Sequence, residues 1–222
     1  MFATDPILPP DPDGLEVLHD REYRVRAFRT GDDRLLIRGA VRDQKPPGMY
    51  VPDDPDPLTM HHMVVELEVD FPSLVIARAE AVLDIHPHTE CPQIEEHYQR
   101  LVGLSIARGF THKVRELFGG PRGCTHTTAL IQAMAPVAVQ CFWSMRASQA
   151  RRTGMDAPFS VSEDESAQAA WRFNLGSCHV WAEDGAYVAQ IEAGEPVEVP
   201  LSIQRRMREL GQDADEFRRA PA

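Results

Sequence analysis

The hydrophobic pattern of this chain changes period near residue 86, and that change limits the folds open to it. Before this point apolar and polar residues alternate, as they do from Val65 to Asp70. After it, apolar residues recur every three or four positions, as on one face of a helix. A set of strands followed by a set of helices is typical of the α+β class. We therefore expect an antiparallel meander sheet packed against a helical C-terminal half.

The first half predicts four strands. Tyr23–Phe28 and Leu35–Asp43 alternate on either side of a polar TGDD turn, which is typical of a hairpin. Two further alternating segments, 61–70 and 74–85, are joined by a tight DFPS turn and follow as antiparallel neighbours. In the second strand the apolar residues share a face with Asp43, so this acid is expected to point inward at the strand end.

The second half predicts helices. Pro92 suits the first position of one helix with Cys91 at its cap, and a second helix ends at Gly119-Gly120. A long apolar helix follows. Beyond about Ala147 we expect an exposed loop, then two short strands within 170–191, and a charged terminal helix from Ser202. The buried stripes predicted for the first two helices are Ile94, Tyr98, Leu101 and Val102, and Ile106, Phe110, Val114 and Leu117.

The 222 residues are enough for one sizeable core. We expect an extended arm over residues 1–18, rich in Pro and Asp, and a single α+β domain over 19–222. The arm suggests a possible homo-oligomer. A formal charge of -11 argues against a nucleic-acid or anionic-membrane partner and favours a small molecule. The absence of a signal-peptide pattern or an apolar run of spanning length favours a cytoplasmic location.

The glycine-rich loop before the long helix delivers two reactive side chains into its first turn. Cys124 lies where free backbone N–H groups and the helix dipole favour a thiolate, which makes it a candidate nucleophile or metal ligand. His126 shares a stripe with Leu130 and Met134, so its imidazole faces inward and must find a partner or line a pocket. The Pro-rich segment 44–59 is long for a connector and is a candidate pocket wall.

Several stretches resemble an uncharacterised bacterial family, domain of unknown function 2889. The GCTH turn after a glycine-rich loop is the most specific of them, although Thr127 and His62 depart from the usual family pattern. The matching segments are Arg34–Pro46, Met60–Asp70, Ile85–Pro92, Leu101–Phe110 and Gly119–Gln140.

This resemblance implies a role in aromatic catabolism. The chain is similar to a lyase that releases formaldehyde from a phenylcoumaran, a lignin-derived dimer. Such a reaction needs a base for the hydroxyl proton and strictly needs no cofactor. We expect His126 or His61 to be that base, and Lys45 or Arg122 to stabilise a phenolate. Asp43 completes the catalytic candidates, and the candidate substrate contacts are Tyr50, Arg122, Cys124 and Tyr98.

Each of these residues also has a plainer interpretation. A buried histidine is more often a hydrogen-bonded core residue, a buried cysteine more often a small hydrophobe, and Asp43 with Lys45 could form a surface salt bridge. A second functional hypothesis is a metal- or iron–sulfur-binding accessory protein that uses Cys91, Cys124 and His126. A third is a non-catalytic small-ligand binding protein with the same pocket.

Overall fold

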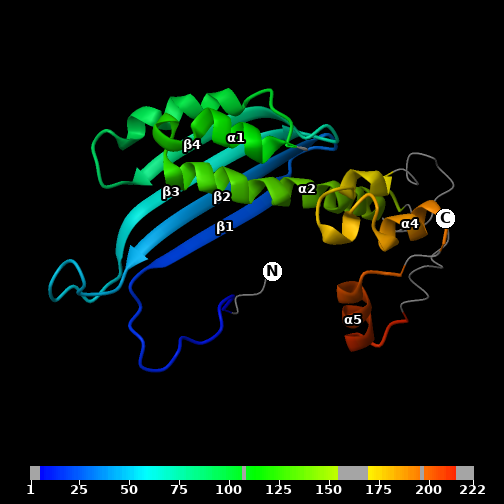
Figure 1. Ribbon diagram of the computed structural model, residues 1–222, viewed down its shortest axis with the longest axis horizontal. Coiled ribbons are helices and arrows are strands. Elements are labelled where there is room, and N and C mark those ends of the chain that lie inside the picture. The colour runs from blue at the N-terminus through cyan, green and yellow to red at the C-terminus, as the bar shows by residue number, and fades with distance from the viewer. Residues whose placement is uncertain (1–5, 107–108, 155–169, 196–197, 214–222) are drawn as a thin grey trace. The chain divides into compact units, whose positions relative to one another are not determined.

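Four antiparallel strands form one sheet in the order β1-β2-β3-β4, and helices follow them in the chain (Figure 1). This computed structural model describes residues 6–106, 109–154, 170–195 and 198–213. It confirms the predicted α+β class and the meander. The strands are β1 (Asp20–Arg29), β2 (Arg34–Lys45), β3 (Leu58–Asp70) and β4 (Val75–Ile85).

The two faces of the sheet differ in composition, as the alternation predicts. The inward residues of β2 and β3, such as Ile37, Val65 and Leu67, are fully buried. The opposite face carries ion pairs between strands, including those that Arg34 forms with Asp70 and Arg78 with Glu68. Burial of one face therefore fixes the register of the strands.

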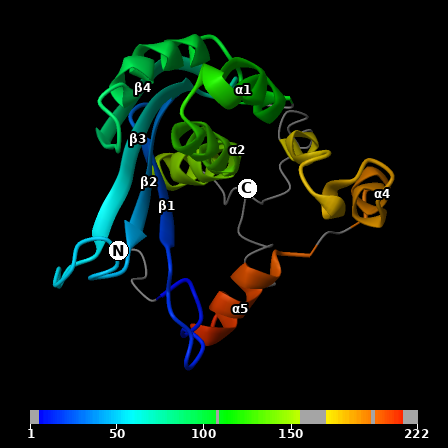
Figure 2. The same cartoon turned by 60° about the vertical axis from the view of Figure 1, so that its left-hand side comes forward.

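Helical segments cover the apolar face of the sheet (Figure 2). They are η1 (Cys91–Leu101), α1 (Phe110–Phe118), η2 (Gly120–Arg122) and α2 (Thr125–Thr153). Tyr98, Leu101 and Val114 are buried as predicted, but Val102 is 44% exposed. The prediction for Val102 was wrong because η1 is a 3₁₀ helix, with three residues per turn, and it ends at Leu101.

A glycine on β2 lets α2 approach the sheet closely. A Cβ atom at Gly39 would lie 2.7 Å from Met134 Sδ and 3.1 Å from Leu130 Cδ1. Both of these α2 residues are fully buried. The first turn of α2 is thereby held over the end of β2 that carries Asp43.

The chain divides into two compact units, residues 1–142 and 143–222. Residues 6–19 contain no helix or strand and are exposed. The arm predicted for residues 1–18 stays a prediction. In the second unit the described elements are η3 (Ala170–Asn174), η4 (His179–Trp181), α4 (Ala186–Glu192) and α5 (Leu201–Glu209). The single domain predicted for 19–222 stays a prediction.

The prediction of two short strands within 170–191 was wrong. This segment closes its hydrogen bonds locally, with Gly176 N–H donating to the Trp181 carbonyl and Trp181 N–H to that of Cys178. Cys178 and His179 consequently begin a 3₁₀ turn. The predicted exposed loop was wrong for Arg151–Thr153, which extend α2, while 155–169 lie outside the described residues. The charged helix near the C-terminus is confirmed by α5.

By length and composition alone, α2 could cross a membrane, although half of its most apolar 18-residue stretch is buried inside the fold. The expectation that no segment reaches such a length therefore does not hold for this helix. Its burial is typical of a core helix. A cytoplasmic location stays a prediction.

Candidate active site

Asp43 lies at the centre of a cluster of charged and titratable side chains. It is 1% exposed at the end of β2, and Arg21 faces it across the β1–β2 ladder. Arg21 Nε donates to Oδ1 and its terminal nitrogen to Oδ2, each at 2.6 Å. Burial raises the pKa of the Asp43 carboxyl, but the hydrogen bonds and charge of Arg21 outweigh it and lower that pKa to about 2. Asp43 is therefore a carboxylate at neutral pH.

Two imidazoles stack beside this carboxylate. His61 comes from β3 and His126 from the first turn of α2, and their ring centroids are 3.9 Å apart. His126 Nε2 lies 3.1 Å and His61 Nδ1 3.3 Å from Asp43 Oδ2. His19 Nε2 lies 3.5 Å from Oδ1. One carboxylate thus faces three imidazoles and a guanidinium.

An irregularity in the β2–β3 ladder accompanies this arrangement. Asp43 pairs with His61, whereas the next residue, Gln44, pairs with Thr59, so Met60 has no partner on β2. His61 points to the apolar face with Met63, while His62 points to the other face, where its Nδ1 lies 2.9 Å from Asp84. Adjacent histidines are thereby separated onto opposite faces of the sheet.

Both stacked imidazoles are biased toward the neutral form. Desolvation lowers the pKa of His61, with Asp43 opposing it. Desolvation lowers the pKa of His126 as well, and the charge of a protonated His61 would lower it further. The centre therefore joins an ionised carboxylate to two neutral imidazoles, which can accept protons at neutral pH.

Tyr98 fixes the turn that carries Cys124 and His126. Its hydroxyl accepts a hydrogen bond from Cys124 N–H at 2.8 Å and donates one to the Cys124 carbonyl at 3.3 Å. Tyr98 is 1% exposed, so its hydroxyl serves the backbone of this turn. Cys124 Sγ lies 3.8 Å from His126 Nδ1, the ring nitrogen that does not face Asp43.

A family model for proteins of unknown function, DUF2889, matches residues 19–140. The chain belongs to this family. The match spans every residue of the centre from His19 to His126. No curated protein and no solved structure matches the chain.

The other predicted site residues of this DUF2889 chain lie apart from the Asp43 contacts. Asp43 pairs with Arg21, not with Lys45, whose Nζ lies 5.6 Å from the centre of the Tyr50 ring. Arg122 is bound to the Arg115 carbonyl at 3.4 Å. Cys91 begins η1 and is partly exposed.

The predicted metal set of Cys91, Cys124 and His126 is not the one that the fold assembles. Within the described part of the chain, the group with metal-ligand spacing is Asp43, His61 and His126. Sequence reasoning missed Arg21 and His19. The hairpin register could have indicated Arg21, because pairing β1 with β2 sets it opposite Asp43. No sequence pattern pointed to His19.

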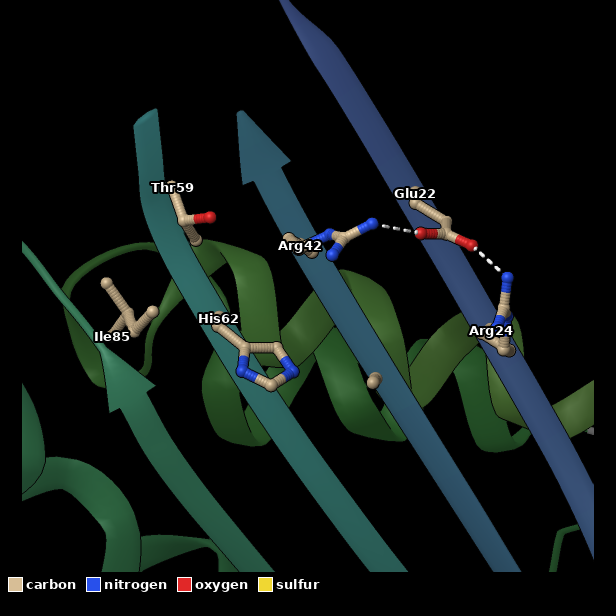
Figure 3. A pocket seen from close by; sticks show the side chains of 7 residues that line it. Glu22, Arg24, Arg42, Thr59, His62 and Ile85 are labelled. Atoms are coloured by element: carbon tan, nitrogen blue, oxygen red, sulfur yellow. Dashed lines mark hydrogen bonds and ion pairs between the residues drawn. The ribbon is translucent and has the colours of Figure 1, made fainter. Parts of the chain in front are cut away.

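A shallow pocket on the opposite face of the DUF2889 sheet is separate from this centre. Figure 3 shows His62, Thr59 and Ile85 around it, with α2 behind the strands. Arg24 and Arg42 both bind Glu22 there. Glu22 is thereby held between two guanidinium groups, and the Asp43 centre, with its stacked imidazoles, is the better candidate for acid–base chemistry.

Proposed function

We propose that this chain is a carbon–carbon lyase that releases formaldehyde from the hydroxymethyl group of an aromatic small molecule. Its acid–base centre is Asp43 with His61 and His126. The supporting observation is the contact of one buried carboxylate with two stacked imidazoles that remain accessible. The imidazoles are 21% and 20% exposed and Asp43 is 1% exposed. A substrate would therefore meet the imidazoles, while the carboxylate orients them.

The chemistry requires one base and one acid. An imidazole takes the hydroxyl proton, and the C–O bond becomes the C=O of formaldehyde as the adjacent carbon–carbon bond breaks. The electron pair of that bond passes into a quinone methide, whose oxygen becomes a phenolate. The quinone methide forms beforehand, when the phenol loses its proton and the benzylic C–O bond of the phenylcoumaran breaks, with its electron pair on the departing aryl oxygen, which takes up a proton. A proton donor then converts the phenolate to a phenol. No oxidant or reductant enters this balance, and two imidazoles on one carboxylate can serve as base and acid.

The resemblance noted in the sequence and the segment after Asp43 support the proposal of an aromatic substrate. Lys45 and Tyr50 lie near each other at the end of β2 and in the loop beyond it. An ammonium group and an aromatic ring suit a phenolate and its ring. Arg122 is a weaker candidate for this role, because it already binds a backbone carbonyl.

The test is formaldehyde release from phenolic dimers that carry a hydroxymethyl group, measured with the wild-type chain and two variants. His61→Ala should lower the rate by about 100-fold or more, as expected for loss of a general base. His62→Ala is the matched control, since its side chain lies one residue away on the other face, and it should keep the wild-type rate. Equal rates in both variants would reject the assigned centre.

A further inference from the structure

We propose that Asp43, His61 and His126 together bind one divalent cation, Zn²⁺ or Fe²⁺. The binding of the cation is independent of the proposed function, whereas its catalytic role rests on that function. Two imidazoles and one carboxylate are typical of catalytic zinc sites and of non-haem iron sites, which keep coordination positions open for substrate.

The distances between the candidate ligand atoms suit such a cation. Zinc lies about 2.0–2.2 Å from imidazole nitrogen and carboxylate oxygen, so neighbouring ligand atoms lie roughly 3–3.5 Å apart. Here Asp43 Oδ2 is 3.1 Å from His126 Nε2 and 3.3 Å from His61 Nδ1. All three ligand atoms lie within 4.8 Å of one another. Two of the three distances between ligand atoms therefore already match those around a bound zinc ion.

One of these ligand atoms is buried without a hydrogen bond. His61 Nδ1 is close to Asp43 but makes no hydrogen bond to any described residue. A buried polar atom without a partner is costly, and a coordinated cation would satisfy it. The imidazole rings are stacked at an interplanar angle of 24°. One ring must rotate to aim its lone pair at a shared cation, so binding should loosen the stack.

The surroundings provide the outer contacts that metal ligands need. Arg21 holds the Asp43 carboxylate through both oxygens. His126 presents its second ring nitrogen, Nδ1, to Cys124 Sγ at 3.8 Å. Such outer partners fix the orientation of ligating side chains and the tautomer of ligating histidines. Cys124 Sγ contacts Nδ1, whereas Asp43 faces Nε2, and among the described residues Cys124 is not part of the group with metal-ligand spacing, so Cys124 is an outer partner and not a ligand.

A cation at this position would change how the substrate loses its proton. The hydroxyl oxygen would bind at an open coordination position, and the cation would acidify the O–H group. The imidazoles would then act as ligands instead of as the base, so the hydroxyl proton would pass to solvent water and the phenolate would take its proton from solvent. The rest of the bond changes would stay as proposed above.

The experiment is titration of the metal-stripped full-length chain with Zn²⁺ and with Co²⁺, followed by calorimetry and absorption. We expect one cation per chain and a cobalt spectrum without a sulfur-to-cobalt charge-transfer band. His61→Ala and His126→Ala should each weaken binding by more than the roughly 10- to 100-fold that loss of an outer partner costs. His62→Ala and Cys91→Ser are matched controls that should bind as the wild type does. Thermal unfolding confirms that each variant is folded, and His61→Gln replaces any His61→Ala protein that is not.

Three outcomes overturn the inference: no stoichiometric binding, unchanged affinity in the folded His61 and His126 variants, or a sulfur charge-transfer band. Formaldehyde release at full rate from the stripped chain would reject the catalytic role and leave the lyase proposal standing. Stoichiometric binding lost in both variants, without formaldehyde from any substrate, would support the cation site and reject the lyase.

Discussion

The imidazoles of His61 and His126 stack with their centroids 3.9 Å apart, and both turn a nitrogen toward the same oxygen of Asp43. The two residues are 65 positions apart in the chain, on a strand and on a helix. Two positive charges at this separation would repel each other strongly. The two neutral imidazoles therefore accept at most one additional proton between them readily. Such a pair can take up and release a proton, or bind a cation in its place.

Arg21 should stabilise the fold chiefly through Asp43. Arg21→Met leaves a carboxylate that is 1% exposed without its bidentate partner, and we expect a loss of about 2 kcal/mol in the free energy of unfolding. This value is below the usual cost of breaking a buried pair because Arg21 is itself 35% exposed. Urea unfolding at pH 7 measures the loss. Arg24→Met is the control, and its exposed pair with Glu22 should contribute less than about 0.5 kcal/mol.

The same pair predicts a pH window for stability in the metal-stripped chain. The pKa of Asp43 falls from 3.8 to about 2 on folding, so its contribution is fully present above about pH 4. It is lost as the pH falls to about 2, because the unfolded chain binds the proton first. The loss amounts to about 2 kcal/mol. Many other carboxylates titrate in this range, so the quantity to measure is the difference in urea stability between the wild type and Arg21→Met. That difference should shrink between pH 5 and pH 2, and a constant difference would contradict the assignment.

Gly39 should be intolerant of a side chain because of Met134. Gly39→Ala places a Cβ atom 2.7 Å from Met134 Sδ, and we expect a loss of about 1–3 kcal/mol from overpacking. In a Met134→Ala background the same substitution should cost less. A double-mutant cycle from urea unfolding gives this coupling. Ala40→Val is the control, since Ala40 lies on the other face of the same strand, and additive effects in the cycle would refute the contact.

Tyr98 should act through the backbone of Cys124. Tyr98→Phe removes the acceptor for Cys124 N–H inside the fold, which should cost about 1–3 kcal/mol. If the turn then shifts, His126 moves relative to Asp43, and zinc affinity should fall by roughly 10-fold or more while formaldehyde release falls with it. Tyr187→Phe, on α4, is the control for both measurements. Full zinc affinity and activity in a destabilised Tyr98→Phe protein would limit Tyr98 to a structural role.

The sheet could be predicted because its signal is local. Alternation in β2, β3 and β4 fixes which face is buried, and it correctly set Asp43 inward and Arg38 outward. The short segments after α2 failed because turns of three to five residues are decided by individual hydrogen bonds, such as that of Gly176 to Trp181. Periodicity does not report these bonds.

The candidate site could be predicted only in part. Asp43, His61 and His126 were each chosen for their place at an element end, but their meeting at one oxygen depends on the β2–β3 register and on how α2 crosses the sheet. Cys91 was included for its helix start. Cys91 lies outside the group of Asp43, His61 and His126. The prediction failed because two residues that each begin a helix can still lie far apart in the fold.

The paired histidines on β3 link the chemistry of the centre to the integrity of the core. A slip of β3 by one residue would bring His62 into the place of His61, so an imidazole would still face Asp43. The same slip would expose Met63, Val65 and Leu67 to water and bury glutamates. A misregistered chain could therefore keep the side-chain chemistry of the centre only by giving up its apolar interior. For this reason, the activity of weakly folded variants should depend more on whether the apolar face of the sheet stays buried than on whether a histidine faces Asp43.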